Sequence, residues 1–152
     1  MNIPYPTMPR TNNHVLGRHT KIMNILSKIA RDIINPPVGN ARMAACVVYR
    51  GDIVSFGVNE MKSHPFQAKY GKNENSVYLH AETAAIKNAL KNITEQELSN
   101  SSLFICRVKF SDCNKTKMTF GLAKPCIGCF RCINTFNIKK VYFSLDNTFL
   151  LI

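Results

Sequence analysis

Two groups of metal-binding residues, more than forty positions apart in the sequence, restrict how this chain can fold. In the first, His80 lies two residues before Glu82, and in the second Pro125 precedes Cys126 and Cys129, which are three positions apart. One imidazole and two thiolates supply three ligands to a tetrahedral Zn²⁺ ion and leave the fourth position to a water. Because the two groups can share one ion only if they meet in space, the sequence predicts a catalytic zinc site with His80, Cys126 and Cys129 as ligands.

A closed, structural zinc site with Cys132 as the fourth ligand is the alternative. On a helix, Cys129 follows Cys126 by about one turn, whereas Cys132 lies ~9 Å along the axis from Cys126 and ~120° round it. Two sulfurs that are each ~2.3 Å from one ion do not span that separation easily. The spacing therefore favours the open, three-ligand site.

Glu82 has the residue type and the position of a proton carrier beside that ion. On a helix that begins at His80, it cannot share the ligand's direction fully, but a glutamate side chain is long enough to reach the bound water. We expect its carboxylate to accept the proton of that water and to pass it on. If His80 and Cys126 each open a helix, both positive helix ends face the metal, which favours thiolate and hydroxide over thiol and water.

The size and composition of the chain fit one compact domain. Of its 152 residues, 45% are hydrophobic and 19% are charged, which is enough apolar material for a core. We interpret residues 1–13, which contain three prolines, as an irregular N-terminal arm and residues 14–152 as a single domain. The sequence has no secretory signal pattern and no apolar run near the roughly 20 residues of a membrane span. We therefore expect a soluble, cytoplasmic protein with reduced cysteines and no membrane partner.

The pattern of apolar residues predicts helices and strands in alternation. Apolar residues at helical spacing indicate amphipathic helices, and short runs rich in β-branched residues indicate strands. In chain order we expect a helix over 18–34, strands over 43–49 and 52–58, a helix over 80–91, a strand over 103–110, a helix over 126–137, a strand over 139–144 and an apolar end over 147–152. Long polar loops are expected over 59–75, as a wall of the site, and over 111–124.

This order of elements indicates a three-layer α/β domain around one mixed sheet. Too few residues separate the strand over 139–144 from the apolar end of the chain for a parallel crossover, which takes about a dozen residues or more. If that end is a strand beside its predecessor, the last two strands run antiparallel. The apolar end also favours a homo-oligomer that would cover it.

Taken together, these residues resemble the cytidine deaminase-like superfamily, the zinc-dependent cytidine and deoxycytidylate deaminases. The resemblance covers nearly all of the chain from Arg18 onward, including a first-hairpin pattern over 44–59. Short segments over 63–67 and 123–126 are similar to small members of viral and phage type. The resemblance implies an α/β/α fold with one mixed five-stranded sheet, a Zn²⁺ cofactor and an intracellular location, which for a viral member is the infected host cell.

The function that this resemblance implies is hydrolytic deamination. The 4-amino group of a cytosine nucleoside or nucleotide (cytidine, deoxycytidine or dCMP) would become a carbonyl with release of ammonia. A zinc-bound hydroxide would be the nucleophile and Glu82 the proton shuttle to the ring nitrogen and the leaving amine. The alternatives are a base-editing deaminase of single-stranded DNA, RNA or tRNA, and a non-catalytic zinc-binding module, against which the presence of Glu82 argues.

The resemblance also implies contacts with the substrate. Asn59, at the end of the second strand, would bind the sugar, and Ala45 would form part of the floor of the base pocket. The backbone N–H of Ala81 would meet a carbonyl of the base. Pro125 is the remaining residue that we expect to bind substrate.

The formal net charge of +11 favours a phosphate-bearing partner, which is a nucleotide or a nucleic acid, although solubility alone also explains a charged surface. Arg42, Lys124 and His64 lie near the expected mouth of the site in sequence terms. We therefore expect these three residues to be candidate ligands for a 5′-phosphate.

Overall fold

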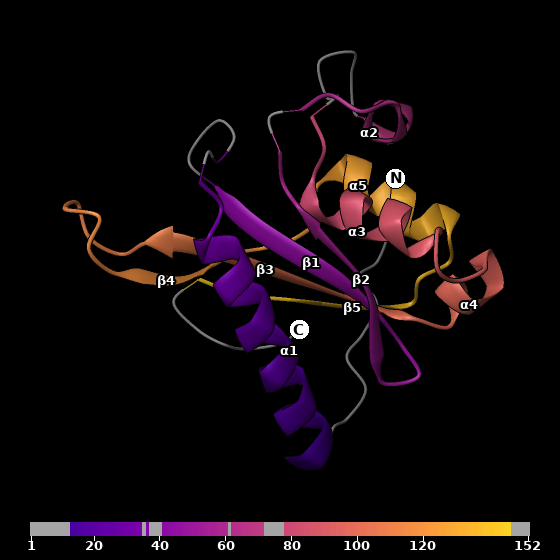
Figure 1. Cartoon of the computed structure of the whole chain (residues 1–152), viewed down its shortest axis with the longest axis horizontal. Helices are drawn as coiled ribbons and strands as arrows, with labels where there is room; N and C mark the ends of the chain where they lie inside the picture. The colour runs from indigo at the N-terminus through magenta and orange to yellow at the C-terminus, as the bar shows by residue number, and fades with distance from the viewer. Residues whose placement is uncertain (1–12, 35, 37–40, 61, 72–77, 147–152) are drawn as a thin grey trace.

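The computed structural model describes residues 13–34, 36, 41–60, 62–71 and 78–146, and Figure 1 shows how they are arranged. Five strands form one mixed sheet: β1 (Arg42–Tyr49), β2 (Asp52–Val58), β3 (Ser102–Phe110), β4 (Met118–Gly121) and β5 (Lys140–Phe143). The order along the sheet is β2-β1-β3-β4, and β5 pairs with β3. Every pairing is antiparallel except β3 with β5, which is parallel.

The sheet separates two helical layers. Helix α1 (Asn13–Arg31) covers one face, and α3 (Ala81–Ala89) and α5 (Ile127–Thr135) lie on the other (Figure 1). Successive residues of a strand point to opposite faces. On β1, Ala44 and Cys46 belong to the core beneath α1, whereas Ala45 and Val47 belong to the core beneath α3 and α5. This alternation confirms the predicted three-layer α/β/α fold.

Helix α3 lies very close to the edge strand β2. A Cβ atom added at Gly57 would come within 2.3 Å of the backbone nitrogen of Ala85 and 2.4 Å of the carbonyl oxygen of Ala81. The amide side chains of Asn88 and Asn92 donate to carbonyl oxygens of β2, at 2.8 and 2.9 Å. The sheet edge is therefore covered by a helix whose first turn is fixed against it.

Two short helices lie where the sequence prediction had none. Helix α2 (Pro65–Tyr70) falls within the stretch over 59–75 that was expected to be a loop. His64 caps its first turn by accepting a hydrogen bond from the backbone of Phe66, and a proline follows at the first helical position. Helix α4 (Glu95–Ser99) begins at a capping box formed by Thr94 and Glu97.

The expected polar loop over 111–124 is a wrong prediction in part, because it contains β4. This strand of four residues pairs with the last four residues of β3. Met118 and Phe120 alternate with a threonine and pack against the core beneath α1. β4 and β5 therefore share one edge of β3, and β4 supplies the fifth described strand.

Helix α1 begins at Asn13 and ends at Arg31, which places it several residues earlier than the predicted 18–34. The arm expected over 1–13 falls outside the described residues except for its last position. The strand expected over 147–152, and with it the antiparallel last pair, lies outside them too. Within the described ranges, no helix combines the length and the apolar character needed to span a membrane.

Candidate metal centre

The two metal-binding groups of the sequence meet on the helical face that carries α3 and α5. Nδ1 of His80 lies 3.5 Å from Sγ of Cys126 and 3.3 Å from Sγ of Cys129. Ligand atoms of these three residues all lie within 4.8 Å of one another. His80 is more than forty residues away in the sequence from both cysteines, so the fold brings the three ligands together, as predicted.

Helix ends position these side chains. His80 is the N-cap of α3 and Cys126 is the N-cap of α5, and neither side chain caps its own helix with a hydrogen bond. Both side chains are therefore available as ligands. Both helices present their N-termini to the same point, where their partial positive charge stabilises thiolate.

The spacing of the ligand atoms fits a tetrahedral zinc ion. Bonds of ~2.3 Å to sulfur and ~2.0 Å to nitrogen place those two atoms about 3.5 Å apart at a tetrahedral angle. The two nitrogen–sulfur distances from His80 agree with that value. One imidazole and two thiolates are also a ligand set that zinc prefers.

The two thiols of the group have pKa values shifted in opposite directions. A hydrogen bond from Cys129 lowers the pKa of Cys126, and the same hydrogen bond, together with burial, raises the pKa of Cys129. The hydrogen bond with Cys126 also raises the pKa of His80. Because a thiol binds zinc as thiolate, zinc binding to both sulfurs requires Cys129 to lose its proton.

Glu82 lies beside the three ligands, in the first turn of α3. Its side chain is only 2% exposed, and Oε2 is buried with no hydrogen-bond partner within the described residues. Burial raises the pKa of this carboxyl, and the neighbouring His80 opposes the shift. A buried carboxyl with an unpaired oxygen next to a metal group is suited to taking and giving up a proton.

Cys132 lies apart from the metal group. Its side chain is buried in the core beneath α3 and α5, and burial raises the pKa of its thiol to about 12. Within the described residues the three-membered group is complete without it. The geometry therefore favours the open site over the closed structural site.

A pocket of about 290 Å³ opens next to His80. Its described lining includes Asn59, which was predicted to bind substrate, and the half-exposed ring of Tyr78. Asn59 is itself held in place: its side-chain oxygen accepts from the backbone of Met43 at 3.0 Å, and its amide donates to the carbonyl of Ala41 at 2.7 Å. The predicted residue is thus at the pocket, with its amide bound to the start of β1.

The other three predicted substrate contacts are all buried residues. Ala45 is fully buried on β1, on the face toward α3. Ala81 is the first residue of α3 and is fully buried, and Pro125 is buried just before the N-cap of α5. Two of the three therefore flank the metal group, one at the start of each ligand-bearing helix.

The three basic residues predicted near the mouth of the site come from three separate segments, β1, the start of α2 and the stretch before α5. Arg42 lies on the α1 side of the sheet, where Nε donates to the carbonyl of Ile33 and the guanidinium lies over Phe110. His64 uses Nδ1 to cap α2. Lys124 is exposed two residues before Cys126. Lys124 is the member of this set that remains beside the metal group.

Sequence reasoning missed Gln67, a residue of α2 that is 1% exposed. Its side-chain oxygen accepts hydrogen bonds from the backbone nitrogen of His80, at 3.1 Å, and from the hydroxyl of Thr83. A buried amide in a stretch that otherwise looked like a polar loop gave no signal of its own. The cap of α2 at His64 and Pro65 was the sequence signal that could have found it.

The comparisons with known proteins agree with this geometry. Residues 17–145 match the family model described as the cytidine and deoxycytidylate deaminase zinc-binding region. No curated protein sequence matches the chain. Among solved structures, the dCMP deaminase of cyanophage S-TIM5 in apo form is 23% identical with a TM-score of 0.52, covering 89% of this chain and 86% of that one. Its complex with dCMP and dUMP gives 22% identity and 0.51, covering 88% and 83%.

A second solved structure is the Thermotoga maritima diaminohydroxyphosphoribosylaminopyrimidine deaminase/5-amino-6-(5-phosphoribosylamino)uracil reductase. It is 20% identical with a TM-score of 0.55, and the match covers 86% of this chain but 30% of that one. This chain therefore corresponds to less than a third of that protein. At these identities the likeness to solved structures shows the fold alone.

Proposed function

The chain belongs to the cytidine and deoxycytidylate deaminase zinc-binding family, and on that premise we propose that it hydrolyses the 4-amino group of a cytosine nucleoside or nucleotide. The observation that carries the proposal is the position of a buried Glu82 carboxyl, whose Oε2 has no hydrogen-bond partner among the described residues, beside the His80, Cys126 and Cys129 group. A binding module has no need of a proton carrier at that point. The two thiolates, the imidazole and the carboxyl are the parts that hydrolytic deamination requires.

The chemistry divides between the metal and the side chains. Zinc, when bound by His80, Cys126 and Cys129, supplies a Lewis acid that makes a water nucleophilic near neutral pH. The Glu82 carboxyl would accept one proton of a water at this site and pass it to the ring nitrogen next to the reacting carbon, and it would then carry the second proton of that water to the leaving amino group. A carbon–oxygen bond forms, the carbon–nitrogen bond breaks, and the products are a uracil base and ammonia.

The pocket beside His80 is the proposed place for the substrate. Its volume of about 290 Å³ is at the small end of the range for ligand pockets, which suits a single nucleoside or nucleotide. Asn59, fixed by its hydrogen bonds to Met43 of β1 and to Ala41 just before that strand, offers the substrate a rigid polar wall. The backbone N–H of Ala81, at the first position of α3, is the proposed donor to the carbonyl of the base, and Lys124 the proposed partner of a phosphate.

A polynucleotide substrate is the second candidate, and Tyr78 is the observation that favours it. Its ring lines the pocket and is 44% exposed, so a base adjacent to the target could stack on it. The net charge of +11 suits a nucleic acid as well as a nucleotide. The two candidates differ in the substrate that is turned over.

The test is ammonia release by the zinc-loaded protein and by Glu82→Gln, which keeps the shape of the side chain but removes the proton carrier. The panel contains cytidine, deoxycytidine, their 5′-monophosphates, the adenine and guanine counterparts and single-stranded oligonucleotides. We expect one cytosine monomer to be turned over, and the variant to lose about 10²–10⁴-fold in rate with its zinc content unchanged. Glu95→Gln, an exposed carboxylate on α4, is the matched control.

Each result points to one interpretation. Turnover of oligonucleotides alone would promote the polynucleotide candidate, and no turnover by a folded, zinc-loaded sample would leave a non-catalytic zinc module. Full activity in Glu82→Gln would remove the assigned role of that residue. A homo-oligomer and a cytoplasmic location also stay predictions. Light scattering of the purified chain tests the first, and imaging of a tagged chain in cells tests the second.

A further inference from the structure

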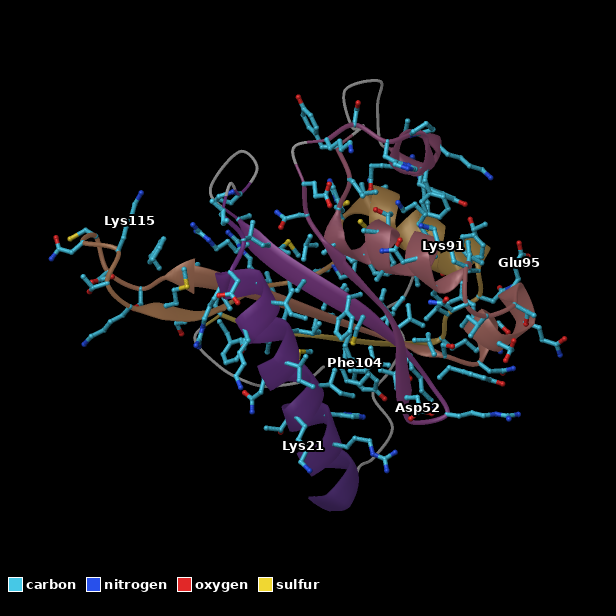
Figure 2. All side chains as sticks on the ribbon, viewed as in Figure 1. Lys21, Asp52, Lys91, Glu95, Phe104 and Lys115 are labelled. Carbon is cyan, nitrogen blue, oxygen red and sulfur yellow. The ribbon has the colours of Figure 1, made fainter. Side chains whose placement is uncertain are left out.

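A second pocket, of about 480 Å³, lies on the α1 side of the sheet, away from the metal centre. It is formed where the N-terminal half of α1 approaches the turn between β1 and β2 and the first residues of β3 and β5 (Figure 1). Its apolar floor includes Val48 and Phe104, which belong to the core beneath α1, and Figure 2 labels Phe104 at this place. The sheet separates this pocket from the metal group.

Three cationic side chains from three different elements line this pocket. Arg18 comes from α1, Arg50 from the turn between β1 and β2, and Lys140 from the start of β5. None of the described lining residues carries a carboxylate, and none of the three cations forms a salt bridge with a described residue. Their charges therefore add up to a positive potential in a pocket that no described lining residue neutralises.

Glu97 is the described acid that interacts electrostatically with Arg50, and it forms no salt bridge with it. Glu97 of α4 is close enough for Arg50 to lower its pKa, but that shift comes first from the backbone hydrogen bond of Thr94. The Glu97 carboxylate accepts this bond at 3.1 Å as part of the capping box. The Arg50 guanidinium lies over the ring of Tyr49, 5.2 Å from its centroid, and the residue lines the pocket without a described salt bridge.

The turn between β1 and β2 holds Arg50 in an unusual backbone conformation, and Arg18 of α1 lies against it. Arg50 has φ 51, in the left-handed region where asparagine, aspartate or glycine is the usual residue, and Gly51 follows with φ 83. A Cβ atom at Gly51 would lie 3.3 Å from Nη1 of Arg18, so that side chain crosses directly over the turn. The turn thus places a guanidinium at the pocket from a backbone conformation that glycine or asparagine adopts more easily.

His19 supplies a second, independent observation. Its ring is 7% exposed, lines the pocket and packs on Phe104 and Tyr142 at centroid distances of 5.1 and 4.4 Å. Nδ1 is buried with no hydrogen-bond partner among the described residues. Burial lowers its pKa, and the charges of Arg18 and Lys140 add to that effect. A buried ring nitrogen without a partner among the described residues, beside three cations without a described salt bridge, points to a ligand at this place.

We propose that this pocket is a second binding site, which takes the phosphate group of a small organic phosphate. Arg18, Arg50 and Lys140 would bind the phosphate oxygens, since guanidinium and ammonium groups form strong charge-assisted hydrogen bonds with phosphate. The apolar floor at Val48 and Phe104 would take the carbon skeleton that carries the phosphate. This proposal does not rest on the deaminase function, because none of its residues touches the metal group.

The test follows the side-chain resonances of the histidines by NMR while the zinc-loaded full chain is titrated with phenyl phosphate, with phenol as the uncharged control. We expect saturable binding that shifts His19 and leaves His80 unchanged. The triple variant Arg18→Ala, Arg50→Ala, Lys140→Ala should weaken binding by at least about tenfold, the loss expected for charge-assisted hydrogen bonds. Lys91→Ala, Lys115→Ala, Lys117→Ala removes the same charge from exposed positions elsewhere and should change the affinity less than about twofold.

Three outcomes would overturn the proposal. They are equal binding of phenol, equal loss of affinity in both triple variants, and a shift of His80 in place of His19. A short single-stranded oligonucleotide that binds through these residues while phenyl phosphate does not would reassign the pocket to nucleic acid. If the triple pocket variant fails to fold, the single variant Lys140→Glu replaces it, because Lys140 is exposed at the start of β5. This variant should abolish phenyl phosphate binding and leave the midpoint of thermal unfolding unchanged.

Discussion

The side-chain oxygen of Gln67 accepts a hydrogen bond from the backbone nitrogen of His80 at 3.1 Å, so a residue of α2 fixes the main chain at the first metal ligand. The other end of α2 meets α5. A Cβ atom at Gly128, between the two ligand cysteines, would lie 3.0 Å from the carbonyl oxygen of Tyr70, and Arg131 donates to the carbonyl of Gly71 at 3.1 Å. One short helix thus holds the two ligand-bearing helices in place.

Replacing Gln67 should weaken zinc binding. Gln67→Met keeps the length of the side chain but leaves the backbone N–H of His80 buried without a partner, which costs about 1–3 kcal/mol. We expect a lower free energy of unfolding and a zinc affinity reduced by about tenfold or more. Urea denaturation and competitive zinc titration measure the two effects. Gln96→Met, at an exposed position of α4, should change neither, and an unchanged zinc affinity in Gln67→Met would contradict the assigned role.

Zinc affinity should rise with pH. The pKa of Cys129 is raised by its hydrogen bond to Cys126 and by burial, and the pKa of His80 is raised by its hydrogen bond to Cys126. Both groups must lose a proton to become ligands, so protons compete with zinc below these raised pKa values. The apparent affinity should increase by about tenfold per pH unit for each proton released. Calorimetry in buffers of different ionisation enthalpy counts the protons, and a pH-independent affinity would refute the scheme.

The six cysteines should differ sharply in their reaction with a thiol reagent. Burial raises the pKa of Cys46 and Cys106 to about 12, so at pH 7.5 these thiols stay protonated and unreactive. Cys113 is exposed and should be modified first in the zinc-loaded protein. Chelation of zinc should add Cys126, which is exposed and has a lowered pKa. Peptide mass spectrometry identifies the modified sites, and early modification of Cys46 would show that the core opens.

A methyl group at Gly57 should disturb the metal centre from the sheet side. The added Cβ would overlap the backbone of α3 at Ala81 and Ala85, and that backbone cannot rotate away as a side chain could. We expect Gly57→Ala to lose about 1–3 kcal/mol or more of folding free energy, together with zinc affinity. Gly17→Ala in α1, which meets nothing within 4 Å, should instead stabilise the protein by roughly 0.5–1 kcal/mol. Thermal unfolding with zinc titration separates the two variants.

The metal group could be predicted because it depends on residue types and on their spacing in the sequence. Few functions other than zinc binding explain the combined pattern of His80, Cys126 and Cys129. Pro125 indicates the start of the helix that carries the two thiols. The alternation on β1 is similarly local, since residues two apart must share a face. These features need no knowledge of which distant segment packs where.

The rest depended on contacts between distant segments. The four residues of β4 are too few for a clear periodic pattern, and they become a strand because β3 offers them an open edge. In the sequence, Gln67 looks like any other polar residue, and its role follows only from the contact of α2 with His80. The residues around the second pocket, such as Arg18 and Lys140, are far apart in sequence, and no local signal joins them.

The position of the metal group also matters for how the chain is tied together. All six cysteines are free, so the molecule has no covalent cross-link between distant segments. An ion bound by His80 and Cys126 would close a loop of 126 − 80 = 46 residues, which contains α3, α4, β3 and β4. On the scale used for disulfides, closing such a loop restricts the unfolded chain by about 4 kcal/mol. The same ion that serves the reaction would thus also connect distant segments of the described chain, so that loss of zinc should lower the protein's stability as well as remove its chemistry.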